Sequence, residues 1–144
     1  MAQRLPEFPA VRWFDAMAPD LDAFEVLAGE AFAALPQVFR DLCGDIQIRI
    51  ADFPEAEILD EMEAETPFDL LGLFVGIGLA QDTGVAETGQ LPNTVFLYRR
   101  PILDYWAENE DSLGAIVAHV LVHEIGHHFG LSDEDMEAIE DAVG

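Results

Sequence analysis

The sequence predicts a single α+β domain in which a small sheet packs against one long helix. Three observations support this fold class. The chain has 144 residues, of which 51% are hydrophobic, and this suits one domain with one core. Segments with the alternation of strands lie in the middle of the chain, and segments with helical periodicity lie on both sides of them. No internal repeat or low-complexity tract divides the chain, so the elements are expected to share one core.

The N-terminal part is predicted to be an arm followed by a helix. Residues 1–19 contain three prolines, and we expect a loose arm on a domain that spans residues 20–144. Asp20 is suited to cap a helix that runs to about residue 34. Pro36 then ends this helix or marks a break. One stripe of the helix is apolar and consists of Phe24, Leu27, Ala28, Ala31 and Phe32.

The middle of the chain predicts three strands. In residues 45–53, isoleucines alternate with Gln, Arg and Ala, which is the period of a half-buried strand that Pro54 stops. An acidic segment, residues 55–65, follows as a short helix or a loop. The apolar run 70–79 predicts a second strand, and residues 93–98 predict its antiparallel neighbour. Residues 80–92 are expected to form a surface loop.

The C-terminal third predicts three helices. Pro101 opens a short helix to about residue 107. Ser112 is a plausible N-cap for a long helix to about residue 129. Ser132 or Asp133 caps a last helix over residues 134–142. The long helix buries one apolar face, formed by Leu113, Ile116, Val117, Val120, Leu121 and Ile125.

The long helix also carries a metal-binding pattern. His123 and His127 are four residues apart, so both imidazoles lie on one face with Glu124 beside them. Gly130 follows, where a helix commonly ends in a left-handed residue and the chain can reverse toward the metal. Asp133 then arrives as a third ligand, with Asp135 and Glu137 as substitutes. Two imidazoles and a carboxylate suit one Zn²⁺ per chain and leave a position open for water.

This arrangement predicts the hydrolysis of peptide bonds. Zinc lowers the pKa of its water toward about 7 and polarises the scissile carbonyl. Glu124 is then the general base that takes the proton of the zinc-activated water and later hands it to the leaving amine. An alternative is a zinc-stabilised protein-interaction domain without catalysis, with an acidic docking surface. Glu124 favours the enzyme, because a structural zinc site needs no base.

The order H-E-x-x-H-x-x-G-x-x-D resembles the zinc motif of the metzincin-like zincins, with Asp133 where metzincins usually carry a third histidine. Snapalysin-type small secreted proteases share the aspartate variant. A closer resemblance is to the minimal zincins, a family of short acidic bacterial metallopeptidase-like proteins, through residues 70–76, 95–103 and 119–136. The resemblance covers most of the chain from about residue 20 and implies a zincin-like domain with a metallopeptidase role. Met136 lies too close to the motif to form the methionine turn of metzincins.

Four other polar residues lie near these motifs. His119 lies four residues before His123 and so continues the spacing of His123 and His127. Three histidines along a straight helix cannot all reach one ion, so we expect His119 to be a hydrogen-bonding neighbour of the site. His128 is expected to point elsewhere. Arg99 and Arg100 either pair with the surplus acids or bind a substrate carboxylate or oxyanion. Residues 73–77 are either an ordinary core strand or the edge strand that receives an extended peptide.

The net charge of the chain limits the classes of partner that it can bind. A net charge of −23 comes from 29 acidic residues against six arginines, which argues against nucleic acid or an anionic membrane as a partner. A basic peptide or protein substrate would be attracted, although the acids also serve simply to solvate the surface. The N-terminal segment lacks the apolar stretch of a secretory signal, so we expect a cytoplasmic protein. Cys43 is the only cysteine, and we expect a buried hydrophobe rather than a nucleophile.

Overall fold

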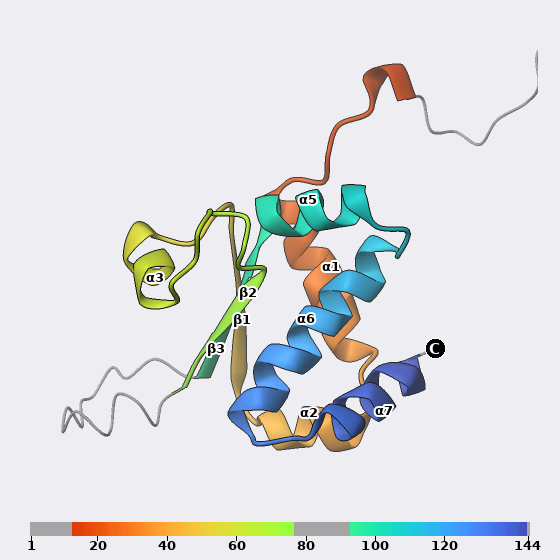
Figure 1. Cartoon of the computed structure of the whole chain (residues 1–144). Helices are drawn as coiled ribbons and strands as arrows, with labels where there is room; N and C mark the ends of the chain where they lie inside the picture. The colour runs from red at the N-terminus through yellow and green to blue at the C-terminus, as the bar shows by residue number, and fades with distance from the viewer. Residues whose placement is uncertain (1–12, 77–92, 144) are drawn as a thin grey trace, which may run out of the picture.

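A mixed sheet of three strands forms the centre of the computed structural model, which describes residues 13–76 and 93–143 (Figure 1). The strands are β1 (Ile46–Ala51), β2 (Gly72–Val75) and β3 (Asn93–Tyr98), in the order β1-β3-β2. β1 is parallel to β3, and β2 is antiparallel to β3. The predicted antiparallel pair is therefore confirmed, with β2 shorter than expected. The rest of that predicted strand, residues 77–79, and the predicted loop 80–92 lie outside the described residues.

Two helices cover one face of this sheet. These are α1 (Leu21–Ala33) and the long helix α6 (Leu113–His128), which pack against each other and against the strands (Figure 1). Asp20 accepts a hydrogen bond from the backbone N–H of Ala23 at 2.8 Å, and Ser112 accepts one from Ala115 at 3.1 Å. Both predicted caps are confirmed, because each side-chain oxygen satisfies an N–H group that has no partner within its helix.

The remaining helices are shorter. They are η1 (Trp13–Asp15), α2 (Gln37–Cys43), α3 (Ala56–Glu61), α5 (Arg99–Glu108) and α7 (Asp133–Val143). The sequence did not predict α2, which begins directly after Pro36. The acidic segment forms the helix α3 rather than a loop, and Figure 1 shows it on the other side of the sheet from α6. α5 begins two residues before Pro101, which is tolerated because the first turn of a helix needs no N–H donor.

The core lies between the sheet, α1 and α6. Its fully buried members include Phe24 of α1, Val95 and Leu97 of β3, and Leu121 and Ile125 of α6. Five of the six residues predicted for the buried face of α6 are buried, and Leu113 is partly exposed. Burying a side chain of this kind contributes about 1.5–3 kcal/mol, so the core fixes the position of α6 against the sheet.

Two minor predictions are also settled. Cys43 is buried and donates a hydrogen bond from its thiol to the carbonyl oxygen of Phe39 at 3.2 Å, as expected for a small core residue. Arg99 forms an ion pair with Asp52 at 2.9 Å and donates to the carbonyl oxygen of Pro19 at 2.6 Å. Arg99 therefore pairs with an acid, and Arg100 lies over the ring of Phe53.

The ends of the chain are only partly described. The predicted division into an arm of residues 1–19 and a domain of residues 20–144 stays a prediction, because the structure describes the chain from residue 13. Within residues 13–76 and 93–143, no helix combines the length and the apolar character that crossing a bilayer requires.

Candidate metal centre

The C-terminal half of α6 presents the predicted imidazoles side by side. The ring centroids of His123 and His127 are 5.7 Å apart, with an interplanar angle of 87°. His123 is partly buried and His127 is exposed. The two rings are neighbours because side chains four residues apart lie one above the other on a helix. The structure thus brings together both histidines of the predicted ligand set.

A second group of metal-ligating side chains overlaps the first at His123. A nitrogen or oxygen atom from each of His119, His123 and Glu140 lies within 4.8 Å of the others. Among the described residues, this is the one group of three or more side chains that could hold a metal ion. His119 Nδ1 is 2.6 Å from one carboxylate oxygen of Glu140, and His123 Nε2 is 3.1 Å from the other. The carboxylate therefore bridges two imidazoles on successive turns of α6. The expected hydrogen bonding of His119 is confirmed, although the group also offers it as a ligand.

Glu140 was not among the ligands predicted from the sequence. It lies on α7, 17 residues after His123, and it reaches α6 only because the chain reverses between the two helices. One signal was present in the sequence. Met136 is apolar and lies four residues before Glu140, so an α7 that buries Met136 against α6 turns Glu140 toward α6 as well.

The turn between α6 and α7 follows the predicted geometry. Gly130 has a φ of +74°, which is the left-handed conformation that lets a helix end and the chain reverse. The two helices then approach closely at Gly126, where an added Cβ would lie 2.6 Å from the sulfur of Met136. Met136 is fully buried. A glycine inside the motif thus lets a buried methionine of α7 pack closely against α6.

The predicted third ligand lies at the first residue of α7. Asp133 is exposed, and it has no hydrogen-bond partner among the residues that the structure describes. Ser132 forms the cap instead, since its hydroxyl accepts from the Asp135 N–H at 3.1 Å while Asp135 accepts from the Ser132 N–H at 3.3 Å. Capping therefore occupies Asp135 and leaves the Asp133 carboxylate available. The assignment of Asp133, with Asp135 and Glu137 as substitutes, stays a prediction.

The side chain of Glu124 lies at the interface between α6 and the strand β2. A Cβ added at Gly72 would lie 3.5 Å from Cγ of Glu124 and 2.6 Å from a methyl carbon of Val120. The backbone of β2 therefore passes directly over this turn of α6. Burial raises the pKa of the Glu124 carboxyl, and the charge of His127 opposes part of this shift. A carboxyl with a raised pKa is better matched to proton transfer near neutral pH.

His128 lies against the strand β2. Its ring lies 4.1 Å from that of Phe74 on β2, at an interplanar angle of 30°. A Cβ at Gly76 would collide with the same imidazole. His128 is thus a packing residue between α6 and β2, as its position 100° around the helix from His127 led us to expect.

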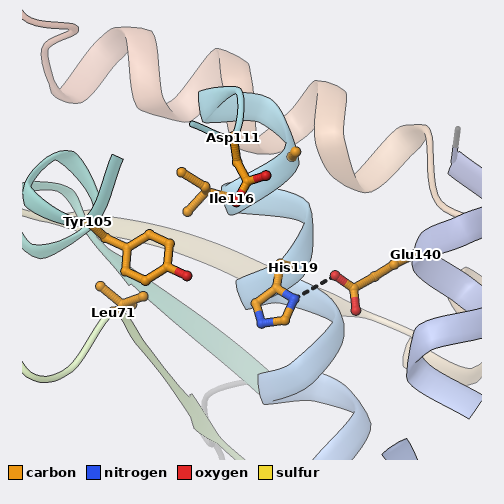
Figure 2. Close-up of a pocket in the computed structure, with 7 residues that line it drawn as sticks. Leu71, Tyr105, Asp111, Ile116, His119 and Glu140 are labelled. Atoms are coloured by element: carbon orange, nitrogen blue, oxygen red, sulfur yellow. Dashed lines mark hydrogen bonds and ion pairs between the residues drawn. The ribbon is translucent and has the colours of Figure 1, made fainter. Parts of the chain in front are cut away.

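A cavity of about 390 Å³ adjoins the metal-ligating group at His119 (Figure 2). Leu71, Tyr105 and Ile116 supply its apolar walls, and Asp111, His119 and Glu140 supply its polar groups. Its volume is in the range of ligand pockets in proteins, about 300–1,000 Å³. The sequence did not predict this cavity, because its walls come from four separate parts of the chain.

Comparison with known families gives one result. A family model described as a zincin-like metallopeptidase matches residues 43–143, which include the whole motif, the sheet and α7. A search of curated proteins found no match. The donor set fits the metal of such a family, because imidazole nitrogens and carboxylate oxygens are zinc ligands and α6 and α7 place three of them within 4.8 Å of one another.

Proposed function

The chain belongs to the zincin-like metallopeptidase family, and on that premise we propose that it is a zinc-dependent peptidase of the cytoplasm that hydrolyses peptide bonds. The observation that carries this proposal is the position of Glu124. Its carboxyl is partly buried beside His127 and lies against an edge strand. A metal site that serves only to stabilise a fold needs no such base.

In this proposal His123, His127 and Asp133 hold one Zn²⁺. Two neutral imidazoles and one carboxylate leave a coordination position open, as in catalytic zinc sites. When bound, zinc supplies a Lewis acid that polarises a carbonyl group and makes water more acidic. Glu140 and His119 then act around the site, since a hydrogen bond that a ligating imidazole donates to a carboxylate fixes the orientation of its ring.

Two features of the chain supply proton transfer and substrate binding in this proposal. Glu124 takes a proton from the water that attacks the scissile carbonyl and delivers it to the nitrogen of the leaving amine. Among the described strands β2 lies at an edge of the sheet beside Glu124, and the outer edge of such a strand offers backbone N–H and C=O groups to an extended peptide. The net charge of −23 attracts basic peptides or proteins as substrates.

Zinc content and hydrolysis test the proposal together. The protein is purified without chelators or a polyhistidine tag, zinc is counted by elemental mass spectrometry, and cleavage of a quenched fluorescent peptide library is followed. We expect about one zinc per chain, a large loss in His127→Ala, and full zinc with activity reduced about 10²–10⁴-fold in Glu124→Gln. Glu134→Gln, an exposed acid of α7, is the matched control.

The second group of ligands gives a competing assignment that the same measurement separates. If His119→Ala removes the zinc and His127→Ala keeps it, the ion is held by His119, His123 and Glu140 instead. Full hydrolysis by Glu124→Gln with zinc retained would contradict the proposed base.

A second function is favoured by the bridge between α6 and α7. Because Glu140 joins His119 and His123 across these helices, a metal there would fix α7 to α6 and stabilise an interaction domain with an acidic docking surface. The interaction domain is the supported function if zinc raises the melting temperature while wild type and Glu124→Gln are equally inactive on the whole library.

A further inference from the structure

We propose that the cavity beside His119 is a specificity pocket for an arginine or lysine side chain of the peptide substrate. The inference rests on the proposed peptidase function and names the substrate class for the same site. It starts from the cavity of about 390 Å³ that opens one helical turn before His123 (Figure 2).

The walls of the cavity suit a long side chain with a charged end. Leu71, Tyr105 and Ile116 are apolar over most of their surface, and the aliphatic stems of lysine and arginine pack well on such residues. The ring of Tyr105 also offers a face to a cation. Asp111 and Glu140 bring two carboxylates, and the described residues that line the cavity include no arginine. A cationic end therefore finds opposite charge on an otherwise apolar wall.

Asp111 is the main electrostatic determinant of this pocket. Among the described residues, the Glu140 carboxylate is occupied by its hydrogen bonds to His119 and His123, whereas Asp111 has no such partner. A guanidinium group can form two parallel hydrogen bonds to a free carboxylate. Asp111 thus supplies a carboxylate that a substrate can use without releasing the histidines.

His119 is tied to Glu140 through one of its ring nitrogens. Nδ1 lies 2.6 Å from a carboxylate oxygen of Glu140, so Nε2 is the ring nitrogen that does not face this carboxylate. Figure 2 shows this second nitrogen turned away from Glu140, on the side of Leu71 and Tyr105, with the hydroxyl of Tyr105 pointing toward the ring. The pocket therefore offers a cationic donor group the Asp111 carboxylate and the Tyr105 hydroxyl oxygen as acceptors.

The position of the pocket relates it to the scissile bond. Gly72 opens the edge strand β2 beside Glu124, and Leu71, the residue before it, lines the cavity. His119 precedes His123 by four residues, a rise of about 6 Å along the helix, and an extended peptide advances about 3.3 Å per residue. A peptide aligned along β2 thus places in the cavity the side chain about two residues from the bond that is cut.

Binding to the inactive zinc-loaded Glu124→Gln protein tests the pocket without requiring cleavage. The probes are fluorescently labelled alanine pentapeptides that carry one arginine at each position in turn, compared with the same peptides carrying neutral, isosteric citrulline. We expect arginine to bind about tenfold more tightly at one position. The preference should disappear in Asp111→Asn, persist in the neighbouring Glu110→Gln, and turn toward a glutamate peptide in Asp111→Arg.

Two results would overturn the pocket. One is equal binding of arginine and citrulline at every position, including no measurable binding of either. The other is a preference that Asp111→Asn and Glu110→Gln reduce equally, which would reflect only the net charge. Cleavage of the peptides by wild type without any preference for arginine would reject the pocket and keep the peptidase. Binding that selects arginine without any cleavage would support the pocket and reject the peptidase.

Discussion

Gly72 and Glu124 face each other across the boundary between sheet and helix, because a Cβ added at Gly72 would lie 3.5 Å from Cγ of Glu124. The edge strand and the proposed base thus share one surface. The same missing side chain lets Val120 of α6 approach β2, since a Cβ would lie 2.6 Å from its methyl carbon. In the proposed function, this arrangement couples the position of a peptide bound along β2 to Glu124, the proposed base.

Gly72→Ala should therefore impair both stability and catalysis. The new methyl group meets Val120 and the carbonyl oxygen of Phe96, which is 2.9 Å away and cannot give way easily. Overpacking of this kind costs about 1–3 kcal/mol, and the strand must move away from Glu124. Urea unfolding and peptide hydrolysis measure the two effects.

Gly29→Ala is the matched control for this change. Gly29 lies inside α1, and a Cβ there meets no atom within 4 Å. Alanine should stabilise the helix by about 0.5–1 kcal/mol and leave hydrolysis unchanged. If both variants behave alike, the contact between β2 and α6 is not tight.

The sequence predicted those parts of the fold that depend on local patterns. The alternating isoleucines of β1 and the caps Asp20 and Ser112 were recognised because each is encoded within a few residues. The helix α2 was missed because it is short and Pro36 reads as an end rather than a start. Glu140 was missed because its contact with α6 depends on the direction of α7 after the turn.

Asp133→Ala should separate metal binding from helix capping. As the proposed third ligand it should lose zinc affinity by orders of magnitude, with little change in the stability of the metal-free protein, because it has no partner among the described residues. Asp135→Ala should do the reverse and cost about 0.5–2 kcal/mol, since Asp135 and Ser132 form the cap. Competition with a fluorescent chelator and urea unfolding give the two values. Unchanged zinc affinity in Asp133→Ala would move the third ligand to another residue.

Met136→Ala should weaken both the core and the metal site. The side chain is fully buried and packs against Gly126, which lies between His123 and His127 in the sequence. Removing it leaves a cavity and costs about 2–5 kcal/mol, and α7 then loses its fixed position under the motif. Met62→Ala, at an exposed position, should change neither unfolding nor zinc binding. Equal stability of the two variants would show that the α6–α7 contact contributes little.

Cys43 gives the protein a pH-dependent stability at alkaline pH. Burial raises the pKa of its thiol from 9.0 to about 11. The folded state holds this proton more tightly than the unfolded state, so the contribution is complete below pH 9 and is lost as the pH rises toward 11. Cys43→Ala should lack this part of the alkaline decline in the free energy of unfolding. A parallel decline in both proteins would assign the loss to other groups, such as Tyr98.

Glu140→Gln should test whether the bridge to His123 supports zinc binding. The carboxylate accepts hydrogen bonds from His119 and His123 together, whereas an amide has only one oxygen with which to accept. Loss of such a partner typically lowers metal affinity about 10–100-fold. The dissociation constant of zinc, measured by chelator competition for wild type, Glu140→Gln and the exposed control Glu134→Gln, decides the role. A loss as large as that of His127→Ala would make Glu140 a ligand itself, and an unchanged constant would show that the bridge does not persist once zinc is bound.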